Sequence, residues 1–365
     1  MTKLHELHEA GQSVWLDFIK RDMLENGDLT RLVSEGIRGL TSNPTIFQKA
    51  IGNSDLYDEQ ILAVMHTQPD PAPSLVFEEL AIRDIRGAAD ILMPVYSASD
   101  GGDGLVSLEV SPHLAHDTAG TIADAHRLWD RVARPNLMIK VPATPAGVPA
   151  VEELTAAGIN VNSTLMFSLD SYIAIANAYV RGLERAADPA GIASVASFFI
   201  SRVDTKADAA LERVGSPDAM NLRGTIAVAN AKLAYLHYLD IFGDDIFGSL
   251  AARGARPQRA LWASTSTKNP EYSDVLYVDD LIGPNTVNTL PPSTIGAFTD
   301  HGTINAAALT TDADEAAASV ESLADMGIDF DAITDELQTE GVAAFAASFD
   351  DLLATLADKM AALSA

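Results

Sequence analysis

The feature that most constrains the fold of this chain is an alternation of eight short apolar runs with longer stretches of helical periodicity. Parallel strands buried on both faces appear as continuous apolar runs, and each needs a helical crossover to reach the next strand. Eight strand–helix units predict an α/β fold, a (β/α)8 TIM barrel. A doubly wound open sheet is the alternative, but no Gly-x-Gly-x-x-Gly follows a predicted strand. The predicted strands are Ser13–Phe18, Ile37–Ser42, Leu105–Val110, Leu137–Pro142, Gly158–Leu165, Ser194–Ile200, Arg259–Ser264 and Thr286–Leu290.

The chain is longer than a simple barrel, which needs about 250 residues. No long Gly/Ser-rich or Pro-rich linker divides its 365 residues, so we expect a single barrel domain over 1–365. Added helices are expected at about 48–98, between strands two and three, and at about 305–365. From Thr311 onward the sequence contains thirteen acidic residues and one basic residue, Lys359, and its apolar residues recur at helical spacing. This pattern predicts an amphipathic helical layer with its acids in solvent, the alternative being an acidic surface for a basic partner.

The net charge of −27 limits the possible partners. A surface this acidic repels polyphosphate, so we expect neither a nucleic-acid partner nor a membrane partner. The absence of cysteine excludes disulfides, thiolate metal sites and a cysteine nucleophile. The first residues lack the apolar core of a secretion signal, which predicts a cytoplasmic protein.

Polar side chains occur at or just after the carboxyl ends of seven predicted strands. In a barrel these ends form one face, where active sites of this fold lie. Charged groups and amides are costly to bury unless they are paired or used, so they are candidate site residues. They are Asp17, Thr41, Ser42, Asn43, Glu109, Lys140, Asn162, Thr164, Ser197, Arg202 and Ser264.

Lys140 indicates the chemistry. It is one of eight lysines and the only one inside a predicted strand. Desolvation disfavours an ammonium and frees the amine to attack a carbonyl, so a lysine inside a barrel is a candidate Schiff-base nucleophile. The alternative is a buried lysine in a structural salt bridge with Asp17 or Glu109.

The remaining candidates fit imine chemistry on a sugar phosphate. Asp17 and Glu109 can each take one of two tasks. One carboxylate transfers the proton of a substrate hydroxyl, and the other binds and activates the water of imine formation and hydrolysis. Asn43, Asn162 and Ser197 can bind hydroxyls. Arg202, with Lys268 as a second candidate, can bind a phosphate. The alternatives are an ion pair of Arg202 with Asp204 or Asp208, and simple solvation of Lys268.

Three motifs resemble those of the transaldolase family. Gly39-Leu-Thr-Ser-Asn-Pro-Thr-Ile-Phe47 is similar to its second-strand signature. Leu137–Thr144, followed by Gly158–Ser168, is similar to its lysine strand and the strand after it. Trp262–Pro270, with Pro284–Pro292, resembles the longer bacterial branch. Together the motifs extend the resemblance over nearly the whole barrel.

The resemblance implies a cofactor-free Schiff-base transferase of the non-oxidative pentose phosphate pathway. Such an enzyme moves a dihydroxyacetone unit from sedoheptulose 7-phosphate or fructose 6-phosphate to glyceraldehyde 3-phosphate or erythrose 4-phosphate. The resemblance assigns the imine to Lys140, acid/base transfer at carbon–carbon cleavage to Asp17, and the catalytic water to Glu109 with Thr164. It assigns substrate binding to Thr41, Asn43, Asn162, Ser197, Arg202 and Ser264.

One position departs from the family pattern. Many members carry a second arginine two residues after the position of Ser264, where this chain has Ser266; Lys268 can substitute as a point charge. Two other functions stay open: an aldolase that releases free dihydroxyacetone, and a barrel that binds phosphosugars without turnover. No metal is expected, because the pairs His5/His8 and His113/His116 have no third ligand nearby in sequence. The sequence does not distinguish a monomer from a homodimer.

Overall fold

The computed structural model describes residues 2–52 and 54–364, and its centre is a closed barrel of eight parallel strands. The strands follow sequence order around the barrel, and the first pairs with the last, Gln12 opposite Thr286. This arrangement confirms the predicted TIM-barrel class and all eight predicted strands. The strands are β1 (Gln12–Leu16), β2 (Gly39–Leu40), β3 (Leu105–Glu109), β4 (Leu137–Pro142), β5 (Val161–Met166), β6 (Ser194–Phe199), β7 (Arg259–Ala263) and β8 (Thr286–Leu290).

Six strands are shorter than their predicted runs, four of them by a single residue and two, β2 and β5, by more. β5 begins at Val161, because Gly158 (φ +84°) adopts the left-handed conformation that ends the preceding helix. β2 is reduced to Gly39–Leu40, where the indole of Trp15 lies so close that a Cβ on Gly39 would approach it to 2.6 Å. An apolar run therefore includes the turn residues that lead into a buried strand.

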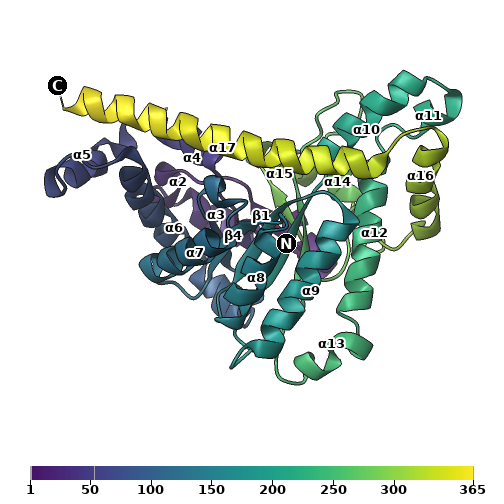
Figure 1. Ribbon diagram of the computed structural model, residues 1–365, viewed down its shortest axis with the longest axis horizontal. Helices are drawn as coiled ribbons and strands as arrows, with labels where there is room; N and C mark the ends of the chain where they lie inside the picture. The colour runs from purple at the N-terminus through teal and green to yellow at the C-terminus, as the bar shows by residue number, and fades with distance from the viewer. Residues whose placement is uncertain (1, 53, 365) are drawn as a thin grey trace.

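Helices surround the barrel, with α4, α5 and α6 between β2 and β3 and α16 and α17 after β8 (Figure 1). Between β6 and β7 the chain forms α10, α11, α12 and α13, with Gly215 (φ +67°) ending the first of them. No helix of residues 2–52 and 54–364 is long and apolar enough to cross a membrane. The helices are α1 (Lys3–Glu9), α2 (Arg21–Glu25), α3 (Asp28–Glu35), α4 (Pro44–Gly52), η1 (Asp55–Tyr57), α5 (Asp58–Thr67), α6 (Pro73–Ala98), η2 (Pro112–Leu114), α7 (Thr118–Val132), α8 (Gly147–Ala156), α9 (Leu169–Arg185), α10 (Ser201–Val214), α11 (Pro217–Asn221), α12 (Ile226–Ile241), α13 (Asp244–Ala251), α14 (Leu276–Asp279), α15 (Pro292–His301), α16 (Ala313–Asp325) and α17 (Phe330–Leu363).

The C-terminal helix α17 crosses the whole molecule, as the yellow ribbon in Figure 1 shows. It packs against α4, α6, α10 and β5. Leu337, Phe345, Leu352 and Leu356 are buried on its inner side. Every acidic residue of this helix is exposed, which confirms the predicted amphipathic layer. The long helix is held by burial of this apolar face rather than by helix propensity alone.

Candidate active site

The candidate residues gather at the carboxyl ends of the strands. Glu109 is the last residue of β3 and lies beside Lys140 of β4. Lys140 in turn lies beside Asn162 of β5. Asp17 directly follows β1, so its side chain enters the same face of the barrel. Four strands and the segments that follow them therefore bring the acid, amine and amide groups to one place.

The Lys140 ammonium lies deep in this face, and the side chain is only 7% exposed. Its Nζ donates a hydrogen bond to the carbonyl oxygen of Ser42 (3.1 Å) and lies 3.8 Å from Oε2 of Glu109. The ring of Phe345, on α17, is 5.9 Å away. The distance to Glu109 is within ion-pair range but beyond hydrogen-bond range. Lys140 and Glu109 therefore form a long ion pair, as the salt-bridge alternative expected, and the amine stays close to a proton acceptor.

Glu109 is a buried carboxyl whose two oxygens have no hydrogen-bond partner in the described residues. Burial raises its pKa to about 7, the positive charge of Lys140 opposes the shift, and the negative charge of Asp17 adds to it. A carboxyl with a pKa near neutrality can both accept and release a proton at working pH. This is the property that proton exchange with an amine or a water requires.

The raised pKa of Glu109 predicts a pH-dependent effect of Glu109→Gln on stability. The pKa of Glu109 is 4.5 in the unfolded chain and about 7 in the folded chain. At pH values between these two, the folded chain keeps a proton on Glu109 that the unfolded chain has released. The stability that Glu109 contributes is therefore complete below 4.5 and lost as pH rises through about 7. We expect Glu109→Gln to unfold at a higher temperature than the natural chain near pH 8, and the difference to shrink towards ~pH 4. Calorimetry over this range measures it, and an equal difference at every pH would contradict it.

Asp17 is oriented by two threonines. The Thr41 hydroxyl donates to Oδ1 of Asp17 (2.8 Å) and lies 2.7 Å from the hydroxyl of Thr289, on β8. Desolvation in the barrel raises the pKa of Asp17, while Lys140, Thr41 and Lys268 lower it. Thr41, expected from the sequence to bind substrate, thus contacts a catalytic candidate directly.

Neutral polar groups line the neighbouring strands. Asn162 donates to the hydroxyl of Ser107 (3.0 Å) and accepts from that of Ser197 (2.7 Å), so its amide is fixed across three strands. Thr164 is buried, and its hydroxyl has no partner within the described chain. Asn43 accepts from the backbone N–H of Ile46 (2.9 Å) at the start of α4, which holds its side chain at the barrel face.

The cationic candidates come from the β6 and β7 ends. Arg202 lies in the first turn of α10, and its guanidinium lies 5.8 Å from the ring centre of Phe199. Within residues 2–52 and 54–364 it forms no ion pair, so the alternative pairing with Asp204 or Asp208 does not occur. Partial burial lowers the pKa of Arg202, and the negative charge of Glu340 on α17 opposes this.

Lys268 is exposed and donates to the Ser266 hydroxyl (2.6 Å). Desolvation lowers its pKa, the charge of Arg202 lowers it further, and Asp17 raises it. Lys268 therefore lies within electrostatic range of both residues, on the side of the barrel where Arg202 lies.

The backbone is strained at two of these strand ends. Leu165 (φ +59°), next to Thr164, and Ser264 (φ +58°) adopt left-handed conformations that side chains other than glycine rarely take. β5 carries a register shift between Ser163 and Met166 at the same point. Ser264 is held by Ser201, whose backbone N–H donates to its carbonyl oxygen (3.1 Å). Such strain concentrates at functional sites, where it fixes side chains that regular strands would direct elsewhere.

The C-terminal helix contributes residues that the sequence did not single out. Phe345 faces Lys140, and Gln338 donates to the carbonyl oxygens of Ala143 and Leu165 at the ends of β4 and β5. Phe345 belonged to the predicted apolar pattern, but periodicity alone does not say which strand a helix covers. Two acidic residues of α17, Glu336 and Glu340, form ion pairs with Lys206 of α10.

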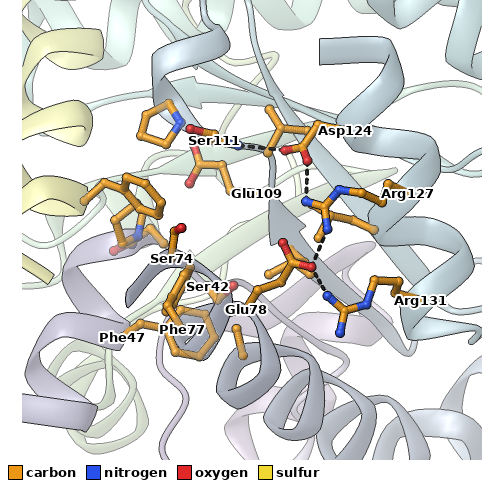
Figure 2. Close-up of a pocket in the computed structure, with 18 of the residues that line it drawn as sticks. Ser42, Phe47, Ser74, Phe77, Glu78, Glu109, Ser111, Asp124, Arg127 and Arg131 are labelled. Carbon is orange, nitrogen blue, oxygen red and sulfur yellow. Dashed lines mark hydrogen bonds and ion pairs between the residues drawn. The ribbon is translucent and has the colours of Figure 1, made fainter. Parts of the chain in front are cut away.

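A cavity of about 400 Å³ lies beside this site, between α4, α6, α7 and α17 (Figure 2). It touches Glu109 but neither Lys140 nor Asp17, so it flanks the barrel face without forming its centre. Its two arginines are paired with acids of the same wall, because Glu78 pairs with Arg127 and Arg131 and Asp124 also pairs with Arg127. The rest of the wall includes three aromatic rings, those of Phe47, Phe77 and Phe349.

Metal ligands do not gather anywhere in the described residues: no group of three His, Asp or Glu side chains could hold an ion. Of the two histidine pairs noted in the sequence, His113 binds Asp350 (2.8 Å) and His5 binds the Thr2 hydroxyl (2.8 Å).

Comparison with known proteins adds an independent line of evidence. Residues 14–356 match the family model described as "Transaldolase/Fructose-6-phosphate aldolase". A protein of Frankia alni named "Transaldolase" is 47% identical over 362 residues, which cover 98% of this chain and 97% of that protein. A "Transaldolase" of Thiobacillus denitrificans is 49% identical over 356 residues, covering 96% and 98%. "Transaldolase 2" of a Nostoc species is 49% identical over 379 aligned positions, covering 99% and 98%.

Proposed function

The chain belongs to the transaldolase/fructose-6-phosphate aldolase family, and on that premise we propose how its barrel face performs the transaldolase reaction. The observation that carries the proposal is the buried Lys140 ammonium, 3.8 Å from a carboxyl whose pKa lies near 7. A carboxyl with this pKa can exchange a proton with a neighbouring group near neutral pH, and the neutral amine is the form of Lys140 that attacks a carbonyl.

The reaction begins at the ketose carbonyl. The Lys140 amine adds to C2 of the donor to give a carbinolamine, which loses water and becomes an iminium. Glu109, together with the Thr164 hydroxyl, handles the proton and the water in this step. Both groups are buried and lack a partner in the described chain, so each can bind a water.

Asp17 then takes the proton of the C4 hydroxyl. The C3–C4 bond breaks, its electron pair moves into the iminium, and an aldose phosphate leaves. The three carbons that remain are held on Lys140 as an enamine. This enamine attacks the aldehyde carbon of the acceptor, Asp17 returns the proton to the new hydroxyl, and water releases the product ketose. The water lost when the donor iminium forms equals the water consumed when the product ketose is released, so atoms and charge balance.

Substrate binding divides between neutral and cationic groups. Asn43, Asn162 and Ser197 bind the hydroxyls of the dihydroxyacetone part. Arg202, with the Ser264 hydroxyl and Lys268, binds the terminal phosphate, because a guanidinium without a partner matches phosphate geometry. The donor is sedoheptulose 7-phosphate or fructose 6-phosphate, and the acceptor is glyceraldehyde 3-phosphate or erythrose 4-phosphate.

We also propose that residues 1–365 act as one barrel domain. A single hydrophobic cluster includes strand residues of the barrel together with residues of α6 and α17, such as Leu80 and Leu352. The helices added to the barrel are thus part of the same core.

Product analysis after borohydride reduction tests the proposal. With fructose 6-phosphate, the reduced protein should carry a three-carbon adduct on the peptide that contains Lys140. Adding erythrose 4-phosphate should convert the bound unit into sedoheptulose 7-phosphate. Without erythrose 4-phosphate, little free dihydroxyacetone should be released. Release of dihydroxyacetone that does not depend on the acceptor would favour an aldolase. Binding without any adduct would favour a barrel that only binds sugar phosphates.

A further inference from the structure

Two buried carboxylates lie close to the proposed phosphate site but take no part in the steps above. Asp204 and Asp208 are one turn apart on α10, and both are nearly inaccessible to solvent. Arg202 lies in the first turn of the same helix yet pairs with neither of them. Buried carboxylates are costly unless their oxygens are satisfied, so their partners indicate what they hold.

Each of the two carboxylates joins the same pair of segments to α10. Asp204 accepts from the backbone N–H of Ala227 (2.7 Å) and from the hydroxyl of Tyr277 (2.7 Å). Asp208 accepts from the backbone N–H of Gly224 (2.9 Å) and from the hydroxyl of Tyr272 (2.7 Å). The two N–H groups lie at the start of α12, Gly224 just before the helix and Ala227 in its first turn, and the two tyrosines belong to the segment between β7 and β8.

The segment between β7 and β8 carries Ser264 and Lys268. Before Lys268 it is anchored by the buried hydroxyl of Thr265, which donates to Asn288 (2.8 Å), whereas its ion pairs after Lys268 are exposed. Glu271 pairs with Arg223 (3.1 Å), but its side chain is 69% exposed. Asp274 pairs with His301 and is 66% exposed. Exposed pairs of this kind stabilise little. The Tyr272 ring, in contrast, packs against Gly224 so closely that a Cβ there would lie 2.9 Å from it.

We infer that the hydrogen bonds Tyr272–Asp208 and Tyr277–Asp204 are positioning contacts that hold Lys268 opposite Arg202 and so set the preference for phosphorylated donors. α10 carries Arg202 at its start, and both tyrosines follow Lys268 within the same segment. The two links fix the cations from β6 and β7 relative to each other. This inference rests on the proposed function, since it assumes that Arg202 and Lys268 bind the substrate phosphate.

The test compares Tyr272→Phe and Tyr277→Phe with Tyr57→Phe. Tyr57 donates an equivalent hydrogen bond to a buried aspartate, Asp84 (2.9 Å), on the opposite part of the chain, so it controls for the loss of a buried Tyr–Asp bond. The measured quantities are kcat/KM for fructose 6-phosphate, kcat/KM for unphosphorylated fructose, and the inhibition constant of inorganic phosphate. Thermal unfolding reports how much each variant loses in stability.

We expect the ratio of the two kcat/KM values to fall about tenfold in Tyr272→Phe and Tyr277→Phe, since a charge-linked contact is lost in each. The inhibition constant of phosphate should rise by a similar factor, while the rate with fructose is retained. Tyr57→Phe should keep the natural ratio even where its stability falls. If both tyrosine variants keep the natural ratio, the inference is wrong. If the natural chain itself shows no preference for the phosphorylated donor, the proposed phosphate site fails instead. Asp208→Asn is the second variant should a tyrosine variant not fold, and the same fall in the ratio is expected.

Discussion

Replacement of Lys140 by alanine is expected to reduce transfer of the dihydroxyacetone unit by about 10⁴-fold or more, because Lys140 is the only lysine on a barrel strand in the described residues and its amine is the proposed nucleophile. No borohydride adduct should form with fructose 6-phosphate at this position. The side chain is buried beside Glu109 and the carbonyl of Ser42, so its removal leaves a small polar gap rather than an exposed apolar surface. The protein should therefore fold, and circular dichroism with thermal unfolding checks that it does.

Two further lysine variants make this expectation specific. Lys140→Arg retains a positive charge but cannot form an imine, so it should be as inactive as the alanine variant. Lys206→Ala removes a lysine of α10 that pairs with Glu336 and Glu340 outside the proposed site, and it should keep nearly full activity. A Lys140→Ala enzyme that still forms the three-carbon adduct would remove Lys140 from the mechanism.

The barrel was predictable because its strands are buried on both faces. A lysine at position 140 and an acid at position 109 interrupt apolar runs, and the parallel register then places them side by side. The eightfold alternation predicted the closed barrel, and the barrel predicted which face would collect the polar ends. The amphipathic character of the C-terminal helix was predictable for the same reason, since its period follows from burial of one side.

Other features depend on tertiary contacts that no local pattern encodes. The sequence does not show that Phe345 faces Lys140, because the periodicity gives a buried side but not its partner. Asp204 and Asp208 were considered as partners of Arg202 because they follow it closely in sequence. They instead bind Tyr277 and Tyr272, which lie more than sixty residues away. Helix α17 likewise covers strands that precede it by more than 150 residues, and the contact with Gln338 at the ends of β4 and β5 becomes visible only in the folded chain.

Asp17→Asn is expected to separate imine formation from carbon–carbon cleavage. Lys140 and Glu109 are intact in this variant, so fructose 6-phosphate should still form the imine. Asparagine cannot take the proton of the C4 hydroxyl, and loss of a general base typically costs about 10²–10⁴-fold. The borohydride adduct on Lys140 should therefore carry all six carbons of the donor, whereas the natural enzyme carries three. Mass spectrometry of the reduced protein distinguishes the two directly.

The hydroxyl that orients Asp17 provides the matched comparison. Thr41→Val removes the 2.8 Å hydrogen bond to Asp17 but leaves the carboxylate in place. Because that hydrogen bond lowers the pKa of Asp17, its loss should raise the pKa further and shift the acid limb of the cleavage rate to higher pH. The adduct should remain three carbons long, and the rate should fall by roughly tenfold, far less than in Asp17→Asn. A three-carbon adduct that forms at the natural rate in Asp17→Asn would show that another group removes the C4 proton. In that case Glu109, the other carboxyl near Lys140, would be the residue to test next for that role.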